Sequence, residues 1–409
     1  MILANHVRVY SLPYPAVYRD TAQLDDSTMN RRSFGIGVVA GLVVSALLIA
    51  VLAAVFGIPL HLLFTPGETG AITGLSADEV DHEVVAEDLE VPWEVIVLEK
   101  DRYLVTERTG DLLLIEDGER QVLRSFDDLE EPLLGEGGLL GIALHPNFEE
   151  NRYLYVYQTV DRESVENTVR RFEVDFEAGE LREETVIIDR IPSDRIHNGG
   201  RIAFGPEGYL YVTAGDSAEA ALAQDTDSLA GKILRLNDDG SIPEDNPFGN
   251  AVYSYGHRNP QGLAWGDAGQ LWATEHGSSA QDELNLIQRG ENYGWPEITG
   301  DETHPEMASP AFHSSEYETW APAGAAAHNG SVFFAGLRGE RLYEAKTANG
   351  EVNTVVAHFF VDFGRLRAVT LGPDGEYLYL TTSNTDGRGE EGADDDRLIR
   401  VPVEAFHSD

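Results

Sequence analysis

The sequence contains no cysteine among its 409 residues. This absence excludes disulfides, thiolate metal ligands, lipid attachment at cysteine and cysteine nucleophiles. Any metal ion that the protein binds must therefore be held by oxygen or imidazole ligands.

Basic residues are scarce as well. Lys and Arg total 29 against 71 Asp and Glu, which gives a formal net charge of -42. A chain this acidic is a poor partner for nucleic acid, whose phosphates bind lysine and arginine. The acidic residues are spread over every segment, which is typical of a surface adapted to very high salt, where screening shortens their repulsion. The alternative is an acidic surface that binds divalent cations at low salt.

Convincing helical periodicity is missing from about residue 85 onward, where short apolar runs are separated by Gly, Asp, Asn and Pro. A turn followed by a strand rich in Tyr, Leu and Val recurs along this part of the chain. It stands at 101–106, 152–157, 206–213, 269–274 and 373–381. Irregular repeats of this kind are typical of propeller blades, which bury their faces against one another. We therefore predict an all-β propeller.

One long apolar run precedes this region. The segment from Phe34 to Phe64 is apolar apart from Ser45 and His61, and it is long enough to cross a hydrocarbon core of roughly 30 Å. Because Arg31 and Arg32 come directly before it, the positive-inside rule predicts a cytoplasmic N-terminus and an extracytoplasmic remainder.

The residues around this run resemble an export signal. The stretch NRRSFG at 30–35 looks like a twin-arginine signal, with Met29 as an alternative start, and no small-residue cleavage site follows. We therefore expect an uncleaved anchor. The predicted organisation is a cytoplasmic tail at 1–30, a signal or membrane anchor at 31–64, a linker at 65–79 and the propeller at 80–409.

Three stretches are unusually dense in Gly, His, Arg, Asn and acidic residues. They read GEGGLLGIALHPNF at 135–148, IHNGGRIAFGPEGYLYVTAGD at 196–216, and GHRNPQGLA at 256–264 continuing to NYGWP at 292–296. Together they resemble the soluble quinoprotein type of glucose/sorbosone dehydrogenase, over about residues 91–401. The resemblance implies a six-bladed β-propeller, an aldose sugar as substrate, and pyrroloquinoline quinone (PQQ) and Ca²⁺ as cofactors.

The resemblance also implies catalytic roles. His197 matches the general base, a role that suits imidazole because its unperturbed pKa is near 6.5. Asp216 matches the carboxylate that orients the base, and Arg258 matches the residue that polarises the quinone. Taken alone, His197 would more often be a structural turn histidine. His257 and His145 are expected to have structural roles.

Other basic and polar residues match cofactor-binding positions. Arg258 and Asn259 match residues that hold the edge of the quinone ring, and Arg338, Arg365 and Arg367 match cations around its three carboxylates. Because Arg365 and Arg367 are two residues apart on an extended segment, their side chains lie on one face. The alternative for these arginines is surface ion pairing with the abundant acids.

Two calcium sites are implied in the same way. In the segment EHGSSAQDE at 275–283, Gly277 and Ser278 match residues whose main-chain carbonyls ligate the ion that also contacts the cofactor. The family usually has Gly-Pro here, a change that need not abolish binding by main-chain carbonyls. Glu283 and Tyr293 match a second, structural site. The alternative for Glu283 is one more solvated acid.

The sugar site is the part of the resemblance with the clearest departures. Glu136 stands where some relatives carry Gln, and Ile196 where some carry Asp. Tyr317 and Trp320 match aromatic residues that cover the cofactor and line the sugar site, with core packing as the alternative.

The resemblance implies oxidation of the anomeric hydroxyl to a lactone, with electrons passing to an unidentified acceptor near the membrane. A calcium-dependent propeller hydrolase of the lactonase type and a non-catalytic sugar-binding propeller are the alternatives. The paired Arg365 and Arg367 favour the dehydrogenase, since neither alternative needs a site for three carboxylates.

Overall fold

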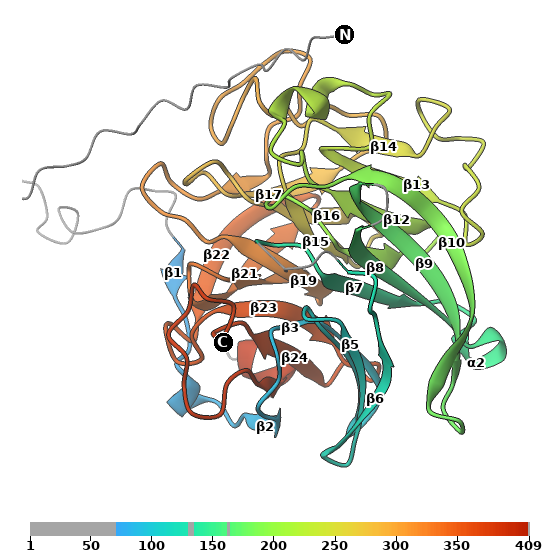
Figure 1. Cartoon of the computed structure of the whole chain (residues 1–409). Helices are drawn as coiled ribbons and strands as arrows, with labels where there is room; N and C mark the ends of the chain where they lie inside the picture. Colours follow the sequence, from blue (N-terminus) through green and yellow to red (C-terminus); the bar gives the residue numbers. More distant parts are fainter. Residues whose placement is uncertain (1–70, 130–134, 162–163, 408–409) are drawn as a thin grey trace, which may run out of the picture. The chain divides into compact units, whose positions relative to one another are not determined.

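The structure, a computed structural model, describes residues 71–129, 135–161 and 164–407. Within these residues the strands form six sheets, and the innermost strands of successive sheets contact one another around a common centre (Figure 1). The predicted all-β, six-bladed propeller is confirmed. Only one short α-helix, α2 (Phe148–Asn151), is present in this part of the chain.

The strands of each blade are named in order from the innermost to the outermost. Blade 1 contains β3 (Pro92–Glu99), β4 (Arg102–Glu107), β5 (Asp111–Glu116) and β6 (Glu119–Ser125). Blade 2 contains β7 (Leu139–Leu144), β8 (Tyr153–Asp161), β9 (Val165–Asp175) and β10 (Glu180–Pro192). Blade 3 contains β11 (Ile202–Phe204), β12 (Leu210–Ala214), β13 (Lys232–Leu236) and β14 (Val252–Tyr255).

The remaining blades complete the ring. Blade 4 contains β15 (Pro260–Trp265), β16 (Leu271–Glu275), β17 (Glu283–Ile287) and β18 (Phe312–His313). Blade 5 contains β19 (Pro322–His328), β20 (Ser331–Gly336), β21 (Arg341–Ala348), β22 (Glu351–His358) and β1 (Ile72–Thr73). Blade 6 contains β23 (Leu366–Leu371), β24 (Tyr377–Thr382), β25 (Leu398–Pro402) and β2 (Glu83–Ala86). Three 3₁₀ helices, η2 (Ala77–Glu79), η3 (Ala220–Gln224) and η4 (Val403–His407), lie between or after them.

The ring is closed by strands from the two ends of the domain. β2 is the outermost strand of blade 6 and pairs antiparallel with β25, with Glu83 opposite Arg400 and Val84 opposite Ile399. Hydrogen bonds between β2 and β25 close the ring, because without β2 blade 6 would lack its outermost strand.

The segment before β2 is more than a linker. Ile72 and Thr73 pair in parallel with Val356 and Ala357 of β22, which corrects the sequence-based interpretation for residues 71–79. The predicted tail at 1–30 and anchor at 31–64 lie outside the described residues. Within the described residues, no helix has the length and apolar character needed to cross a membrane.

The core consists of apolar layers between neighbouring blades. One layer joins Tyr157 and Val169 of blade 2 to Val212 and Leu234 of blade 3, all of them fully buried. Burial of alternate strand residues on both faces of each sheet is what makes every blade depend on its neighbours. The propeller therefore fixes the positions of the strand ends at its centre.

Close approach at the centre demands a glycine. The amide of Gly141 in β7 donates to the carbonyl oxygen of Gly200, just before β11, at 3.0 Å. A Cβ at position 141 would lie 2.3 Å from that oxygen. Any larger residue would therefore push the innermost segments of blades 2 and 3 apart.

Arg400 tests the importance of ring closure. Its guanidinium binds Asp101 at 2.8 Å and also Glu83 of β2, while only 8% of its side chain is exposed. Arg400→Ala removes both contacts, so we expect a loss of about 1–2 kcal/mol in the free energy of unfolding, measured by thermal or urea denaturation. Arg182, half exposed and paired with Asp175 and Glu180, is the matched control. Equal losses in Arg182→Ala and Arg400→Ala would contradict a special role for the closing strand.

Candidate active site

Predicted site residues and their neighbours gather where the innermost strands begin. Asn259 directly precedes β15, Arg365 directly precedes β23, and Arg201 directly precedes β11. Trp93, near the start of β3, lies under the guanidinium carbons of Arg201 at 4.4 Å and Arg367 at 5.8 Å from its ring centroid. Residues from four blades are thus brought to one place by the fold.

His197 and Asp216 form a buried hydrogen-bonded pair. Nδ1 of His197 lies 2.6 Å from Oδ1 of Asp216. The carboxylate is itself fixed, because Oδ1 accepts from the amide of Ala218 at 2.9 Å and Oδ2 accepts from Nε1 of Trp295 at 2.8 Å. A carboxylate on Nδ1 favours the tautomer that carries its proton there, which leaves Nε2 with a lone pair. The pair therefore has the arrangement of a general base and its orienting acid.

Glu136 supports the backbone of His197. Its Oε2 accepts from the amide nitrogen of His197 at 3.0 Å, and its Oε1 accepts from Nη1 of Arg388 at 3.1 Å. Burial acts to raise the pKa of Glu136, but the nearby His276 ring, the His197 amide and Arg388 outweigh it, so the pKa is lowered. Glu136 therefore remains ionised beside the base.

Arg258 and Asn259 present unpaired donors to the same region. Nη1 of Arg258 donates to the carbonyl oxygen of His276 at 3.3 Å, and the guanidinium lies 5.3 Å from the ring centroid of Trp295. Asn259 accepts from the amide of Gly199 at 3.0 Å. Nε of Arg258 and Nδ2 of Asn259 are buried without a hydrogen-bond partner. Such groups are costly unless a ligand satisfies them.

Arg365 and Arg367 share one carboxylate, as expected for side chains on one face. Nη2 of Arg365 donates to Asp386 at 2.7 Å, and Nη2 of Arg367 lies 3.8 Å from the same oxygen. Arg365 also donates to the carbonyl oxygens of Ser383 and Leu337, at 3.2 and 3.1 Å. Its donors are thus engaged by the protein, whereas Arg367 is held less tightly.

Two further arginines join them. We call Arg108, Arg201, Arg365 and Arg367 the arginine group. Burial lowers the pKa of Arg201 to about 9 and that of Arg367 to about 10, and it also lowers the pKa of Arg108. Nη2 of Arg201 is buried without a partner. An anion bound here would stabilise the charged guanidiniums, so the arginine group is suited to carboxylates.

Several of these residues were not predicted from the sequence. Trp295 and His276 lie inside the motifs at 292–296 and 275–283, so the motifs themselves carried a signal. Burial lowers the pKa of His276, and its Nε2 has no hydrogen-bond partner. Arg201 lies inside the motif at 196–216, whereas for Arg108 and Arg388 the only signal was the scarcity of basic residues.

His257 and His145 are held by protein contacts, in agreement with the structural roles expected for them. The ring of His257 is fully buried, with Nδ1 2.8 Å from Glu275 and Nε2 2.8 Å from the hydroxyl of Ser254. It also stacks on Tyr293 at 4.8 Å. Nδ1 of His145 accepts from the amide of Asn147 at 2.9 Å.

The expected calcium loop is fixed at its base. The amide of Gly277 donates to Asp282 at 2.8 Å, and Asp282 in turn accepts from the amide of Trp320 at 2.6 Å. These contacts orient the peptides of Gly277 and Ser278. In the part of the chain that the structure describes, no group of three or more His, Asp or Glu side chains is placed to hold a metal ion.

The second expected calcium site contains an unusual carboxyl group. Burial and the charge of Glu275, its partner across β16 and β17, raise the pKa of Glu283 to about 8. Glu283 accepts from the amide of Gly300 and from Asn285, both at 3.0 Å. Tyr293 lies buried against His257. A cation would favour the ionised form of Glu283.

Three predicted residues occupy places that differ from expectation. Trp320 is fully buried and stacks on Phe312 at 5.9 Å, so core packing, the alternative interpretation, describes it. Tyr317 is 93% exposed and covers nothing. The side chain of Arg338 is exposed, and its backbone amide donates to the carbonyl oxygen of Trp320 at 3.1 Å. The site that the structure assembles therefore excludes Trp320.

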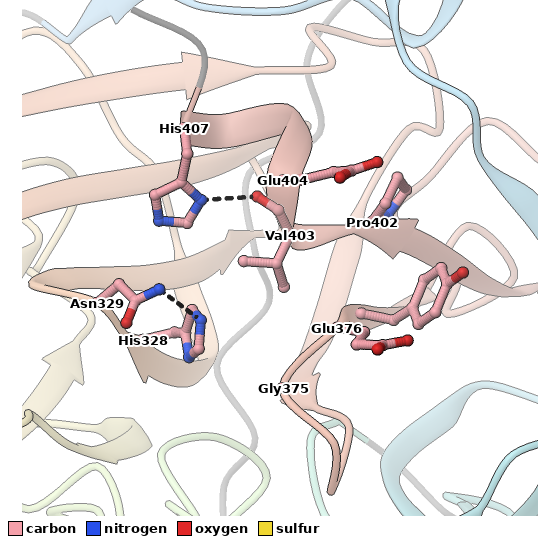
Figure 2. A pocket seen from close by; sticks show the side chains of 9 residues that line it. His328, Asn329, Gly375, Glu376, Pro402, Val403, Glu404 and His407 are labelled. Atoms are coloured by element: carbon pink, nitrogen blue, oxygen red, sulfur yellow. Dashed lines mark hydrogen bonds between the residues drawn. The ribbon is translucent and has the colours of Figure 1, made fainter.

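A separate hollow of about 500 Å³ lies away from these residues (Figure 2). His328 and Asn329 from the end of β19, the β23–β24 turn at Glu376, and Val403 and His407 of η4 line it. These residues follow the C-terminal ends of β19, β23 and β25, whereas the candidate site lies at the N-terminal ends of the innermost strands. A hollow of about 610 Å³ beside Arg388 and Gly364 does border the candidate site.

The raised pKa of Glu283 predicts a pH-dependent stability. In buffer without divalent cations, the folded state keeps a proton that the unfolded state releases above pH 4.5, so the associated stability is lost as pH rises through about 8. Glu283→Gln should remove this loss, which melting temperatures at pH 6 and pH 9 will measure. Glu316, an exposed acid, provides the control Glu316→Gln. A pH dependence that is identical in wild type and Glu283→Gln would contradict the assignment.

Comparison with known proteins identifies the family. The sequence model of the family Glucose / Sorbosone dehydrogenase matches residues 89–399. Aldose sugar dehydrogenase YliI of Escherichia coli is 31% identical over 348 residues, which cover 75% of this chain and 91% of that protein. Quinoprotein glucose dehydrogenase B of Acinetobacter calcoaceticus is 33% identical over 289 residues, 63% of this chain and 59% of that protein. The PQQ-bound aldose sugar dehydrogenase of Streptomyces coelicolor has a TM-score of 0.74 and 40% identity, and the match covers 79% of this chain and 98% of that one. The chain therefore belongs to the glucose/sorbosone dehydrogenase family.

Proposed function

We propose that this protein is a quinoprotein oxidoreductase that oxidises an aldose sugar at its anomeric hydroxyl, with PQQ and Ca²⁺ as cofactors. The observation that carries the proposal is the His197–Asp216 pair beside a group of buried arginines. A base and a site for a polyanionic cofactor stand together, as a dehydrogenase of this family requires.

The residues present fit the quinone. Its carboxylates would bind Arg108, Arg201 and Arg367, whose pKa values burial lowers, and Nε of Arg108 and Nη2 of Arg201 have no hydrogen-bond partner. Arg258 and Asn259 would hold the ring edge with their unpaired Nε and Nδ2 donors. When bound, the quinone supplies a two-electron acceptor for the hydride of the sugar. Arg338 and Tyr317 are both exposed and would contact the quinone only at its outer edge.

The calcium assignments rest on oxygen donors. The main-chain carbonyls of Gly277 and Ser278 would ligate one ion, since the contacts of Asp282 orient these peptides. Glu283 would ligate the second ion with its carboxylate and Tyr293 with its carbonyl. Burial and the charge of Glu275 raise the pKa of Glu283 to about 8, and a cation bound beside it would favour the ionised form.

The chain's own groups account for the proton transfer. Asp216 holds the Nδ1 proton of His197, so Nε2 is the atom that takes the proton from the anomeric hydroxyl. The same carboxylate stabilises the imidazolium that results. Arg258 lies close enough to Asp216 and Glu275 to be part of this charge network, and its guanidinium would stabilise negative charge on the acceptor.

The buried arginines also separate this proposal from its alternatives. A lactonase-type hydrolase or a non-catalytic sugar-binding propeller has no need for several buried guanidiniums without full anionic partners. The product of oxidation would be a lactone.

The cellular setting is proposed from the sequence. The apolar segment 34–64 supports export and anchoring at the cell membrane, with the propeller outside the cytoplasm and an electron acceptor among membrane carriers. The net charge of -42 supports a high-salt environment.

His197 is the first test of the function. His197→Ala should lower sugar-dependent dye reduction by about 10²-fold or more, the usual scale for loss of a general base, without loss of quinone binding. Asp216→Asn should also lower turnover, because the amide cannot stabilise the imidazolium. His304→Ala, at an exposed histidine, is the control. Turnover that survives in His197→Ala would defeat the assignment.

The two paired arginines should behave differently. Arg367→Gln should weaken quinone affinity, measured by titration of the metal-loaded apo-protein, more than it alters turnover at saturating quinone. Arg365 donates to Asp386, Ser383 and Leu337, so Arg365→Gln should also lower the melting temperature. The double variant should bind most weakly. Unchanged affinity in the double variant would assign both residues to internal ion pairing.

A further inference from the structure

The backbone of His197 has a conformation that its surroundings must enforce. Its φ is 61°, in the left-handed region that residues with a side chain rarely adopt. The facing residues Ser217 and Ala218 have φ values of 54° and 59°, and the amide of Ser217 donates to the carbonyl oxygen of His197 at 3.3 Å. Two strained segments thus support each other around the base. Asp216 fixes the imidazole of His197 by a hydrogen bond, but the position of the imidazole also depends on the left-handed backbone of this residue.

The amide of His197 is held from a different blade. Oε2 of Glu136, in the segment before blade 2, accepts from it at 3.0 Å. Glu136 is 17% exposed in its side chain, and both of its oxygens are engaged by protein donors. In this geometry, each oxygen of Glu136 already accepts a hydrogen bond from the protein, one of them from the backbone of His197.

The second donor to Glu136 comes from the far end of the chain. Arg388 lies 252 positions away, in the β24–β25 loop of residues 383–397. The loop is anchored beside it, because Asp386 accepts from Arg365 at 2.7 Å and from the amide of Arg388 at 2.9 Å. One loop therefore touches both the arginine group and the support of the base.

We propose that Glu136 is a positioning residue for His197 and that Arg388 holds Glu136 in place. The β24–β25 loop is then a strap that runs from blade 6 to the segment before blade 2. This proposal rests on the proposed function for the role of His197 as base, but the contact itself is a property of the protein without cofactor. Loss of the strap should reduce the fraction of molecules with a correctly placed base, which lowers kcat more than KM.

Hydrogen exchange of the cofactor-free protein tests the contact. In Glu136→Ala, the amide of His197 loses its acceptor, so exchange in overlapping peptides covering 194–200 should become faster, on the order of tenfold. Arg388→Ala should give a smaller change of the same sign. Glu136→Gln keeps an acceptor oxygen and should restore slow exchange. Arg289→Ala is the matched control, since Arg289 is 53% exposed, like Arg388, and pairs with Asp245 at 3.3 Å.

Sugar oxidation by the holoenzyme tests the consequence. We expect Glu136→Ala and Arg388→Ala to lower kcat by roughly threefold to tenfold with a smaller change in KM, and Glu136→Gln to recover part of the loss. Arg289→Ala should match wild type in both assays. Exchange at 194–200 that is unchanged in Glu136→Ala and Arg388→Ala would overturn the proposal, as would a change in KM alone. A wild-type enzyme that oxidises no sugar would contradict the proposed function, while the exchange result would still decide the contact.

Discussion

Burial of positive charge at the centre of an acidic protein is the constraint on which the site depends. Arg201 and Arg367 are each less than a tenth exposed, and burial lowers their pKa values to about 9 and about 10. In a chain with a net charge of -42, such groups are stabilised only by specific anions. Glu94 pairs with Arg201, and Asp386 pairs with both Arg365 and Arg367.

The propeller makes this burial possible because it collects residues from distant parts of the chain. Trp93, Arg201, Asn259 and Arg365 lie at or next to the first residues of four innermost strands, so ring closure by β2 and β25 indirectly sets their distances. The position of His197 also depends on residues from separate parts of the chain. His197 keeps a left-handed backbone because Asp216, Glu136 and the segment at Ser217 hold it from three sides.

Much of this arrangement could be predicted from the sequence, and the exceptions have physical reasons. The turn-and-strand repeats predicted the propeller, and the family resemblance of the motif at 196–216 implied that Asp216 orients His197, which its hydrogen bond to the ring allows. Burial could not be predicted for Trp320, because an aromatic residue before a strand fits a core as well as a sugar site. The contact of Arg388 with Glu136 spans 252 positions, and no local pattern encodes such a pair. The short strand β1 pairs only two residues, too few for a recognisable strand pattern in the sequence.

The most direct test of the account is a titration of the cofactor-free protein with PQQ in the presence of Ca²⁺, followed by absorbance. The account predicts saturable binding of about one quinone per chain and a change to the spectrum of the reduced cofactor when an aldose is added. Weak, non-saturable binding, or a bound quinone that no aldose reduces, would contradict it.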